Sequence, residues 1–97
     1  MTITTKQNGN EATIELTGRL DTVTAPDLEK EIQGLSSSKK LVLDFSSLDY
    51  ISSAGLRVLL SAHKDFSKKD GMTICNVNET ILDIFDVTGF KDVLNIQ

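Results

Sequence analysis

The sequence predicts an α/β domain: a mixed β-sheet with about three to four helices packed mainly on one face. Two observations lead to this fold class. Near the start, alternating apolar residues flank Asn8-Gly9, a pair typical of a tight turn between antiparallel strands. Later, an apolar run, a helical apolar stripe and a further strand follow one another over residues 41–77. That succession is typical of a β–α–β unit with parallel strands.

The first half of the chain predicts two strands and one helix. The strands are marked by apolar residues at every other position, namely Ile3, Ala12, Ile14 and Leu16, and the second of them ends at Thr17-Gly18. Residues 21–27 form a turn in which Thr24 and Asp27 have the spacing of a capping pair and Pro26 suits a first helical turn. A helix follows, with its apolar stripe at Leu28, Ile32 and Leu35.

The second half predicts two strands and two helices. A buried strand over 41–45 runs into a polar loop that ends in two serines. A helix then opens at 54–56 and is expected to close at Gly71, and its stripe comprises Leu56, Leu59, Leu60, His63 and Phe66. A strand over 72–77 and a helix from Glu79 to about Val87, ending near Gly89, complete the pattern. The tail 93–96 is expected to form a short strand or a helical turn.

Length and composition bound the class of protein. The 97 residues suit one domain, 1–97, with a core of its own. A net charge of −4 argues against nucleic acid as a partner. Apolar runs of about five residues fall short of the roughly 20 that cross a bilayer, and the start lacks the pattern of a signal peptide. We therefore expect a cytoplasmic protein with no membrane partner. The lone Cys75 is expected to be a buried strand thiol.

Ser52 and Ser53 stand at the predicted N-terminus of the helix that opens at 54–56. Unpaired backbone N–H groups and the positive end of the helix dipole gather at such a position, which suits either an N-cap or a phosphate group. A phosphate would take the net charge from −4 toward about −6. The dipole would stabilise it by on the order of 0.3–1 kcal/mol, so the fold should tolerate the modification. From spacing alone, N-cap, nucleophile and phosphorylation site all remain open.

The surrounding sequence does not support a catalytic nucleophile. The only histidine, His63, lies ten residues after Ser53 on the same helix, about 15 Å along its axis. The Gly-x-Ser-x-Gly pattern is absent, and Asp44 and Asp49 stand at a strand end and in a turn, where aspartate is common. The sequence holds no Gly-rich phosphate loop, paired cysteines or His-Glu metal motif. We therefore predict no catalytic residue, no metal and no cofactor, and a protein that is not an enzyme.

Three segments resemble the STAS-domain family, and more closely its bacterial anti-sigma-factor antagonists. They are Gly18-Arg19-Leu20-Asp21, the stretch from Leu43 to Leu56 with its Ser-Ser-Ala-Gly-Leu block, and the Phe-x-x-x-Gly pattern at Phe85–Gly89. The resemblance implies a partner-switching module. In that family the unmodified protein binds an anti-sigma factor that usually is also a serine kinase. Phosphorylation by that kinase releases the antagonist, and a PP2C-type phosphatase reverses the modification.

The resemblance also implies roles for individual residues. The family's phosphorylated residue is followed by one residue and then Gly-Leu, which selects Ser53, with Ser52 as a second candidate acceptor. Members often carry Asp at the position of Ser52, so this chain departs from the pattern there. The acid of the Gly-x-Leu-Asp segment falls on Asp21, expected beside the phosphorylation site. The expected partner surface comprises Asp21, Thr22, Ser52, Ser53, Gly55, Leu56 and Arg57.

A second function remains open from the sequence. The chain could be a stand-alone STAS module that senses a nucleotide or a lipid, or a subunit of a larger signalling or transport complex. Phosphorylation of Ser53 by a kinase would favour the partner switch, whereas a bound small ligand without a kinase partner would favour the sensor.

Overall fold

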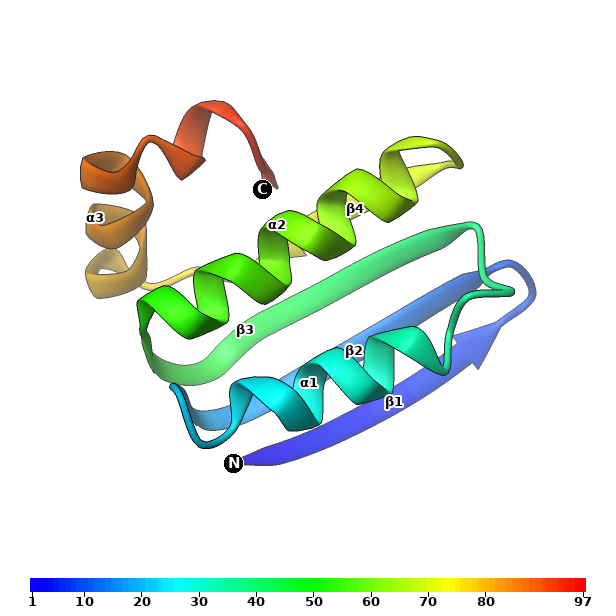
Figure 1. The fold of residues 1–97 in the computed structure, drawn as a ribbon, viewed down its shortest axis with the longest axis horizontal. Helices are drawn as coiled ribbons and strands as arrows, with labels where there is room; N and C mark the ends of the chain where they lie inside the picture. Colours follow the sequence, from blue (N-terminus) through cyan, green and yellow to red (C-terminus); the bar gives the residue numbers. More distant parts are fainter.

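The elements follow one another in the predicted order in the computed structural model of residues 1–97 (Figure 1). They are β1 (Thr2–Asn8), β2 (Glu11–Leu20), α1 (Ala25–Gln33), β3 (Lys40–Ile51), α2 (Ser53–Ser67), β4 (Gly71–Cys75), α3 (Glu79–Thr88), the 3₁₀-helix η1 (Phe90–Asp92) and β5 (Asn95–Ile96).

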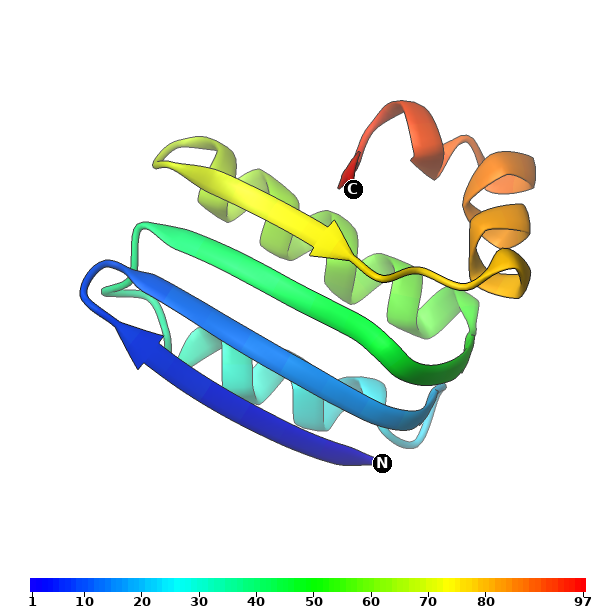
Figure 2. The same ribbon diagram turned by 180° about the vertical axis from the view of Figure 1, so that it is seen from behind.

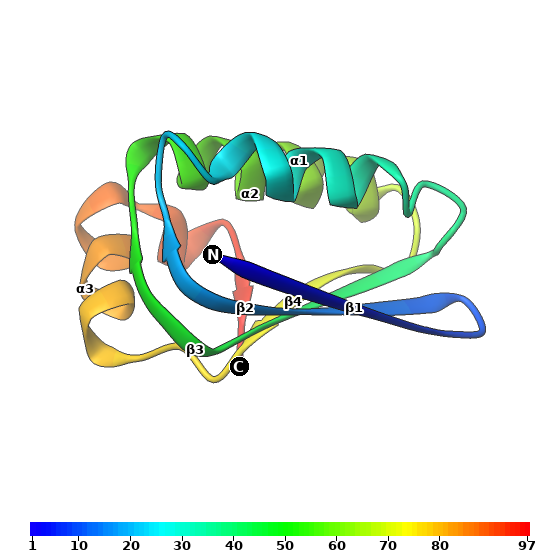
Figure 3. The same cartoon turned by 90° about the horizontal axis from the view of Figure 1, so that it is seen from below.

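The five strands lie in the sheet in the order in which they occur in the chain. β1 is antiparallel to β2, and each of the other neighbouring pairs is parallel, which confirms the predicted mixed sheet and its β–α–β unit. α1 and α2 lie side by side over one face of the sheet (Figures 1 and 3). The other face carries no helix, as Figure 2 shows from behind. α3 packs at one end of the sheet, where the final parts of β2 and β3 curve toward the helix layer (Figure 3).

The predicted turn between β1 and β2 is confirmed, and it is as short as a hairpin allows. Asn8 pairs with Glu11, so only Gly9 and Asn10 lie in the loop. Gly9 has a φ of 64°, the conformation that the first central residue of a type II′ turn requires. The pairing of β1 with β2 continues from this turn to Thr2 without a shift in register.

β3 is much longer than predicted. The sequence indicated a strand over 41–45 and then a polar loop, whereas the strand continues to Ile51 and only Ser52 separates it from α2. The alternation that marks a strand is interrupted because β3 carries two extra residues relative to β2. From the pair Glu15↔Asp44 to Thr17↔Ser47, and again from Gly18↔Leu48 to Arg19↔Tyr50, β3 advances one residue further than β2. Such bulges bend a strand and change which face a side chain points to.

Smaller differences concern the ends of the later elements. α2 ends at Ser67, and Gly71, with a φ of 97°, opens β4 instead of closing the helix. β4 stops at Cys75 because Asn76 takes a φ of 59° and turns the chain. The Cys75 thiol is half-exposed, not buried as expected. The tail contains both of the expected forms, first the helical turn η1 and then the short strand β5.

α3 has the expected extent and clear end signals. The Asn78 side chain accepts a hydrogen bond from the Ile81 N–H at 2.9 Å and donates one to the Leu48 carbonyl at 2.8 Å. It therefore caps the helix and fastens it to the bent part of β3. Gly89 ends the helix in the left-handed region with a φ of 79°.

The core is one continuous cluster of 23 buried apolar residues between the sheet and the helices. Ile81 and Phe85 of α3 belong to this cluster, so α3 also packs against the bent end of the sheet. None of the helices has the length and apolar character needed to cross a bilayer. This packing fixes the positions of the ends of β2 and β3. The residues of the candidate site follow directly after these two strands.

Candidate functional site

The ends of β2 and β3 bring two distant segments together. The backbone N–H of Ser52 donates to the Leu20 carbonyl at 2.9 Å, so the chain leaves both strands at the same place. The turn at 21–24 after β2 and the start of α2 after β3 are therefore neighbours at one end of the molecule (Figure 1). The sequence expectation that Asp21 lies near the serine pair agrees with this arrangement.

Gly55 sets how closely α2 approaches the sheet. A Cβ atom at this position would lie 2.7 Å from Leu20 Cγ and 2.8 Å from Ile51 Cγ1. Distances this short are not tolerated, and both neighbouring side chains are completely or almost completely buried. The absence of a side chain at Gly55 thus allows the first turn of α2 to pack closely against the ends of β2 and β3.

The two serines have different environments. Ser52 stands at the N-cap position with an extended backbone, but its side chain makes no capping hydrogen bond, and its Oγ is buried without a partner. Ser53 is the first residue of α2 and its side chain is exposed. The hydrogen-bonded N-cap that spacing left open is therefore absent at both serines. Of the two hydroxyls, the one on Ser53 is accessible to another protein.

Asp21 organises the neighbouring turn. Its Oδ1 accepts hydrogen bonds from the backbone N–H groups of Val23 at 3.0 Å and Thr24 at 3.1 Å. In return the Asp21 N–H donates to Thr24 Oγ1 at 2.9 Å, and the Thr24 hydroxyl donates to the Arg19 carbonyl at 2.8 Å. The predicted capping pair of Thr24 with Asp27 is wrong, because the Thr24 side chain is engaged with the turn that precedes the helix.

The same hydrogen bonds change the acidity of Asp21. The backbone N–H of Thr24 is the main cause that lowers the pKa of the carboxyl below its ordinary value, and the N–H of Val23 lowers it further against a rise from desolvation. A carboxylate with a lowered pKa in the folded state stabilises the fold above its unfolded pKa, and that stabilisation is lost as the pH falls through the folded value.

This linkage predicts a pH-dependent stability that one substitution should remove. The free energy of unfolding should fall more steeply below a pH of about 3.8 in the wild type than in Asp21→Asn, whose amide oxygen still accepts both bonds but does not titrate. Urea unfolding between neutral pH and about pH 3 measures this. Asp21→Ala, which loses the acceptor, should be less stable at every pH. Parallel curves for the wild type and Asp21→Asn would contradict the assignment.

The predicted partner residues divide into an exposed and a buried group. Thr22, Ser53 and Arg57 are exposed, and Asp21 and Ser52 are partly exposed. Gly55 and Leu56 are buried, so they shape this surface by packing and present little to a partner. A shallow groove of about 220 Å³ adjoins the exposed group between the first turns of α1 and α2, and Thr22, Pro26, Glu29, Ala54 and Arg57 are among its lining residues.

Sequence reasoning missed one prominent residue of this surface. Val23, at the tip of the turn that Asp21 organises, has 82% of its surface exposed. A valine so placed between two threonines is outside the apolar stripe of α1. That isolation from the stripe was the available signal that the Val23 side chain would be exposed at this surface.

Comparison with known proteins identifies the family. The STAS domain model matches residues 2–97. The chain belongs to the STAS-domain family. Among STAS relatives, the anti-sigma-B factor antagonist of Bacillus subtilis is 30% identical over 94 residues, with 95% of this chain and 86% of that protein covered.

Solved structures of anti-sigma factor antagonists share the fold of this chain. An anti-sigma factor antagonist from Mycobacterium paratuberculosis superposes with a TM-score of 0.87 at 23% identity, covering 98% of this chain and 83% of that one. The Bacillus antagonist SpoIIAA gives 0.78 in its unphosphorylated form, at 15% identity and over 99% and 87% of the two chains. Its phosphorylated form gives 0.77 at 16% identity, over 99% and 91% of the chains. This STAS chain therefore resembles both forms of SpoIIAA about equally.

Proposed function

We propose that this STAS protein is an anti-sigma factor antagonist whose binding is switched by phosphorylation of Ser53. In the unmodified state it binds an anti-sigma factor that is also a serine kinase, through the exposed residues around the start of α2 and the turn at 21–24. The kinase transfers phosphate from ATP to the Ser53 hydroxyl, and the modified antagonist is released. A PP2C-type phosphatase restores the bound state.

One observation carries the choice of Ser53. Its side chain is exposed on the first residue of α2, whereas the Ser52 hydroxyl is buried and its N–H is bonded to Leu20. A kinase must reach the hydroxyl from solvent, so the two neighbouring serines differ in the property that matters. A phosphate on Ser53 would also lie at the positive end of the α2 dipole, which stabilises an anion.

The effect on the partner follows from charge. Asp21 lies in the neighbouring turn, and because neutral pH is far above the ordinary pKa of an aspartate, and the pKa of Asp21 is lowered further, its carboxylate is charged there. A phosphate on Ser53 adds about −1.5 to −2 charge to a surface that already carries this carboxylate. A partner surface that is complementary to the unmodified serine would then face a bulky, hydrated and negatively charged phosphate, which weakens binding. The names of the relatives, which are antagonists of anti-sigma factors, support the identity of that partner.

Labelling tests the proposal directly. Incubation with ATP and an anti-sigma factor kinase from the same organism should place phosphate on Ser53, located by mass spectrometry of the digested protein. Ser53→Ala should remove the label, and Ser52→Ala should keep it. Because the Ser52 hydroxyl has no hydrogen-bond partner, that control should also unfold at nearly the wild-type urea concentration. Labelling that persists in Ser53→Ala would contradict the site.

A further inference from the structure

The two edges of the sheet are protected to different degrees. β5, at one edge, has only two residues, and β1, at the other, has seven. β1 contains no proline and no bulge, and its single charged residue, Lys6, points to the face without helices, 3.7 Å from Glu15. Short length, prolines, bulges and charges are the devices that keep an edge from pairing with another chain. β1 lacks most of them.

The hairpin geometry identifies which backbone groups of β1 are free. Asn10 O accepts from Lys39 and Lys40 N–H, so the even-numbered residues of β2 face β3 and its odd-numbered residues face β1. Asn8 pairs with Glu11 across a two-residue turn, which fixes the alternation along β1. The N–H and C=O groups of Ile3, Thr5 and Gln7 therefore point away from the sheet and lack a strand partner.

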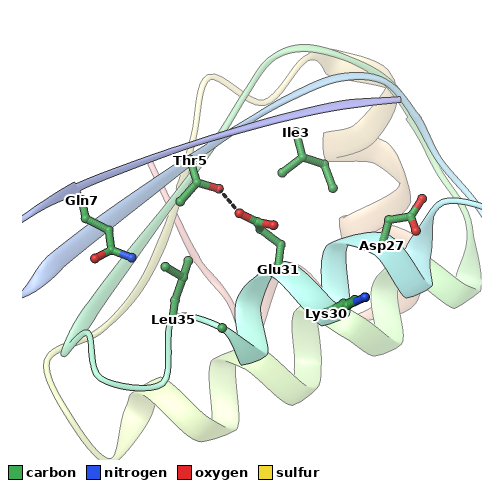
Figure 4. Close-up of a pocket in the computed structure, with 8 residues that line it drawn as sticks. Ile3, Thr5, Gln7, Asp27, Lys30, Glu31 and Leu35 are labelled. Carbon is green, nitrogen blue, oxygen red and sulfur yellow. Dashed lines mark hydrogen bonds between the residues drawn. The ribbon is translucent and has the colours of Figure 1, made fainter.

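The same three residues line a cleft beside the free edge. α1 does not cover β1 fully, and a cavity of about 790 Å³ remains between them (Figure 4). Ile3, Thr5 and Gln7 point into it from β1, and Glu31 points back from α1, where its Oε1 accepts a hydrogen bond from Thr5 Oγ1 at 2.7 Å. The same residues of β1 would therefore bond to the backbone of an added strand and contact its side chains.

The charges of the cleft favour one kind of occupant. Asp27 and Glu31, one helical turn apart on α1, line it together with a single cation, Lys30, so its lining carries a net charge of −1. Ile3 from β1 and Leu35 from the segment that follows α1 add apolar surface to its lining. A strand placed along β1 directs every second side chain into the cleft. Lysine or arginine at those positions would meet the two carboxylates.

We propose that β1 is a docking edge for an extended segment of another protein that carries basic side chains at alternate positions. The segment adds to the sheet as a sixth strand by bonding to Ile3, Thr5 and Gln7, and its basic residues enter the cleft toward Asp27 and Glu31. This edge lies on the side of α1 away from α2, so the proposal does not depend on phosphorylation of Ser53 (Figure 1).

A second copy of this chain is a poorer occupant of the edge. If two copies paired their β1 strands antiparallel with Thr5 opposite Thr5, the two Glu31 carboxylates would lie close together at the two-fold axis, because each is hydrogen-bonded to its own Thr5. A pair centred on Lys6 would set the two lysines opposite one another. Like charges directly opposed across strands are destabilising. The edge is therefore better suited to a basic segment than to itself.

Amide NMR of the whole chain tests the proposal with a defined probe. The probe is a short acetylated peptide, as long as β1, in which lysine alternates with threonine; glutamate replaces lysine in the control peptide. The lysine peptide should shift the amide signals of Ile3, Thr5 and Gln7 and slow their hydrogen exchange. The amides of Thr4 and Lys6, already bonded to β2, should keep their exchange rates.

Two variants separate strand pairing from charge. Thr5→Pro removes an N–H that faces solvent, so it should weaken peptide binding about tenfold while its thermal stability stays close to that of Thr5→Val, which likewise loses the hydroxyl that bonds to Glu31. Thr5→Val, which keeps the N–H, should retain most of the affinity. Glu31→Gln should weaken binding about threefold and reduce its salt dependence. Equal binding of both peptides, equal binding by Thr5→Pro, or protection of Ile3, Thr5 and Gln7 that rises with protein concentration alone would overturn the proposal.

Discussion

Gly55→Ala is expected to destabilise the domain by about 1–3 kcal/mol, the usual cost of overpacking a dense core. The added methyl would lie 2.7 Å from Leu20 Cγ and 2.8 Å from Ile51 Cγ1, so α2 must move away from the sheet or both side chains must shift. The sign is informative, because replacing glycine by alanine within a helix ordinarily stabilises it by roughly 0.5–1 kcal/mol. Urea unfolding monitored by circular dichroism measures the change.

Gly34→Ala provides a matched control at the end of α1. Gly34 has ordinary helical angles, and the nearest atom to an added Cβ is the Glu31 carbonyl oxygen at 3.4 Å. This variant should be neutral or slightly stabilising. Because Gly55 also positions the first turn of α2, Gly55→Ala should weaken binding of the anti-sigma factor as well. A Gly55→Ala protein as stable as Gly34→Ala would show that the contact with Leu20 relaxes freely.

Ser53→Asp is expected to weaken binding of the anti-sigma factor by about tenfold to a hundredfold without loss of stability. The carboxylate mimics part of the phosphate charge, and like charges brought together at an interface cost up to several kcal/mol. At the first position of α2 the same charge should raise the free energy of unfolding by roughly 0.3–1 kcal/mol through the helix dipole. Affinity by titration calorimetry and stability by urea unfolding therefore move in opposite directions.

Ser53→Asn supplies the uncharged comparison. It has nearly the shape of the aspartate variant, so any difference between the two reports charge. The mechanism requires Ser53→Asn to bind more tightly than Ser53→Asp at low salt, with the difference shrinking as salt is added. If both variants lost the same affinity, bulk at this position would explain the switch and the role given to the neighbouring Asp21 carboxylate would fail.

Much of the fold could be predicted because its signals are local. The turn at Asn8-Gly9, the apolar run at 41–45 and the stripe of α2 each lie within one short window, and each corresponds to an observed element. The extension of β3 could not be predicted, because its extra residues are defined only by pairing with β2, which lies far away in the sequence.

The candidate site was predictable in its location but not in its details. Ser52 and Ser53 both suit a helix start, and only packing decides that the first hydroxyl is buried and the second exposed. Thr24 has two acceptable partners by spacing, Asp21 and Asp27, and the choice depends on how the chain leaves β2. The sequence does not show that Gly55 is needed for close packing, because its neighbours Leu20 and Ile51 are known only from the structure.

The direct passage from β3 into α2 fixes the rotational phase of the helix. Only Ser52 lies between the last residue of the strand and the first of the helix, and its N–H is tied to Leu20. Each residue of an α-helix turns by about 100°, so adding or removing one residue here would turn Ser53 from solvent and bring a core residue such as Leu56 outward. The number of residues at this junction is therefore constrained as well as their identity. Homologous chains should differ here by substitution and not by insertion or deletion.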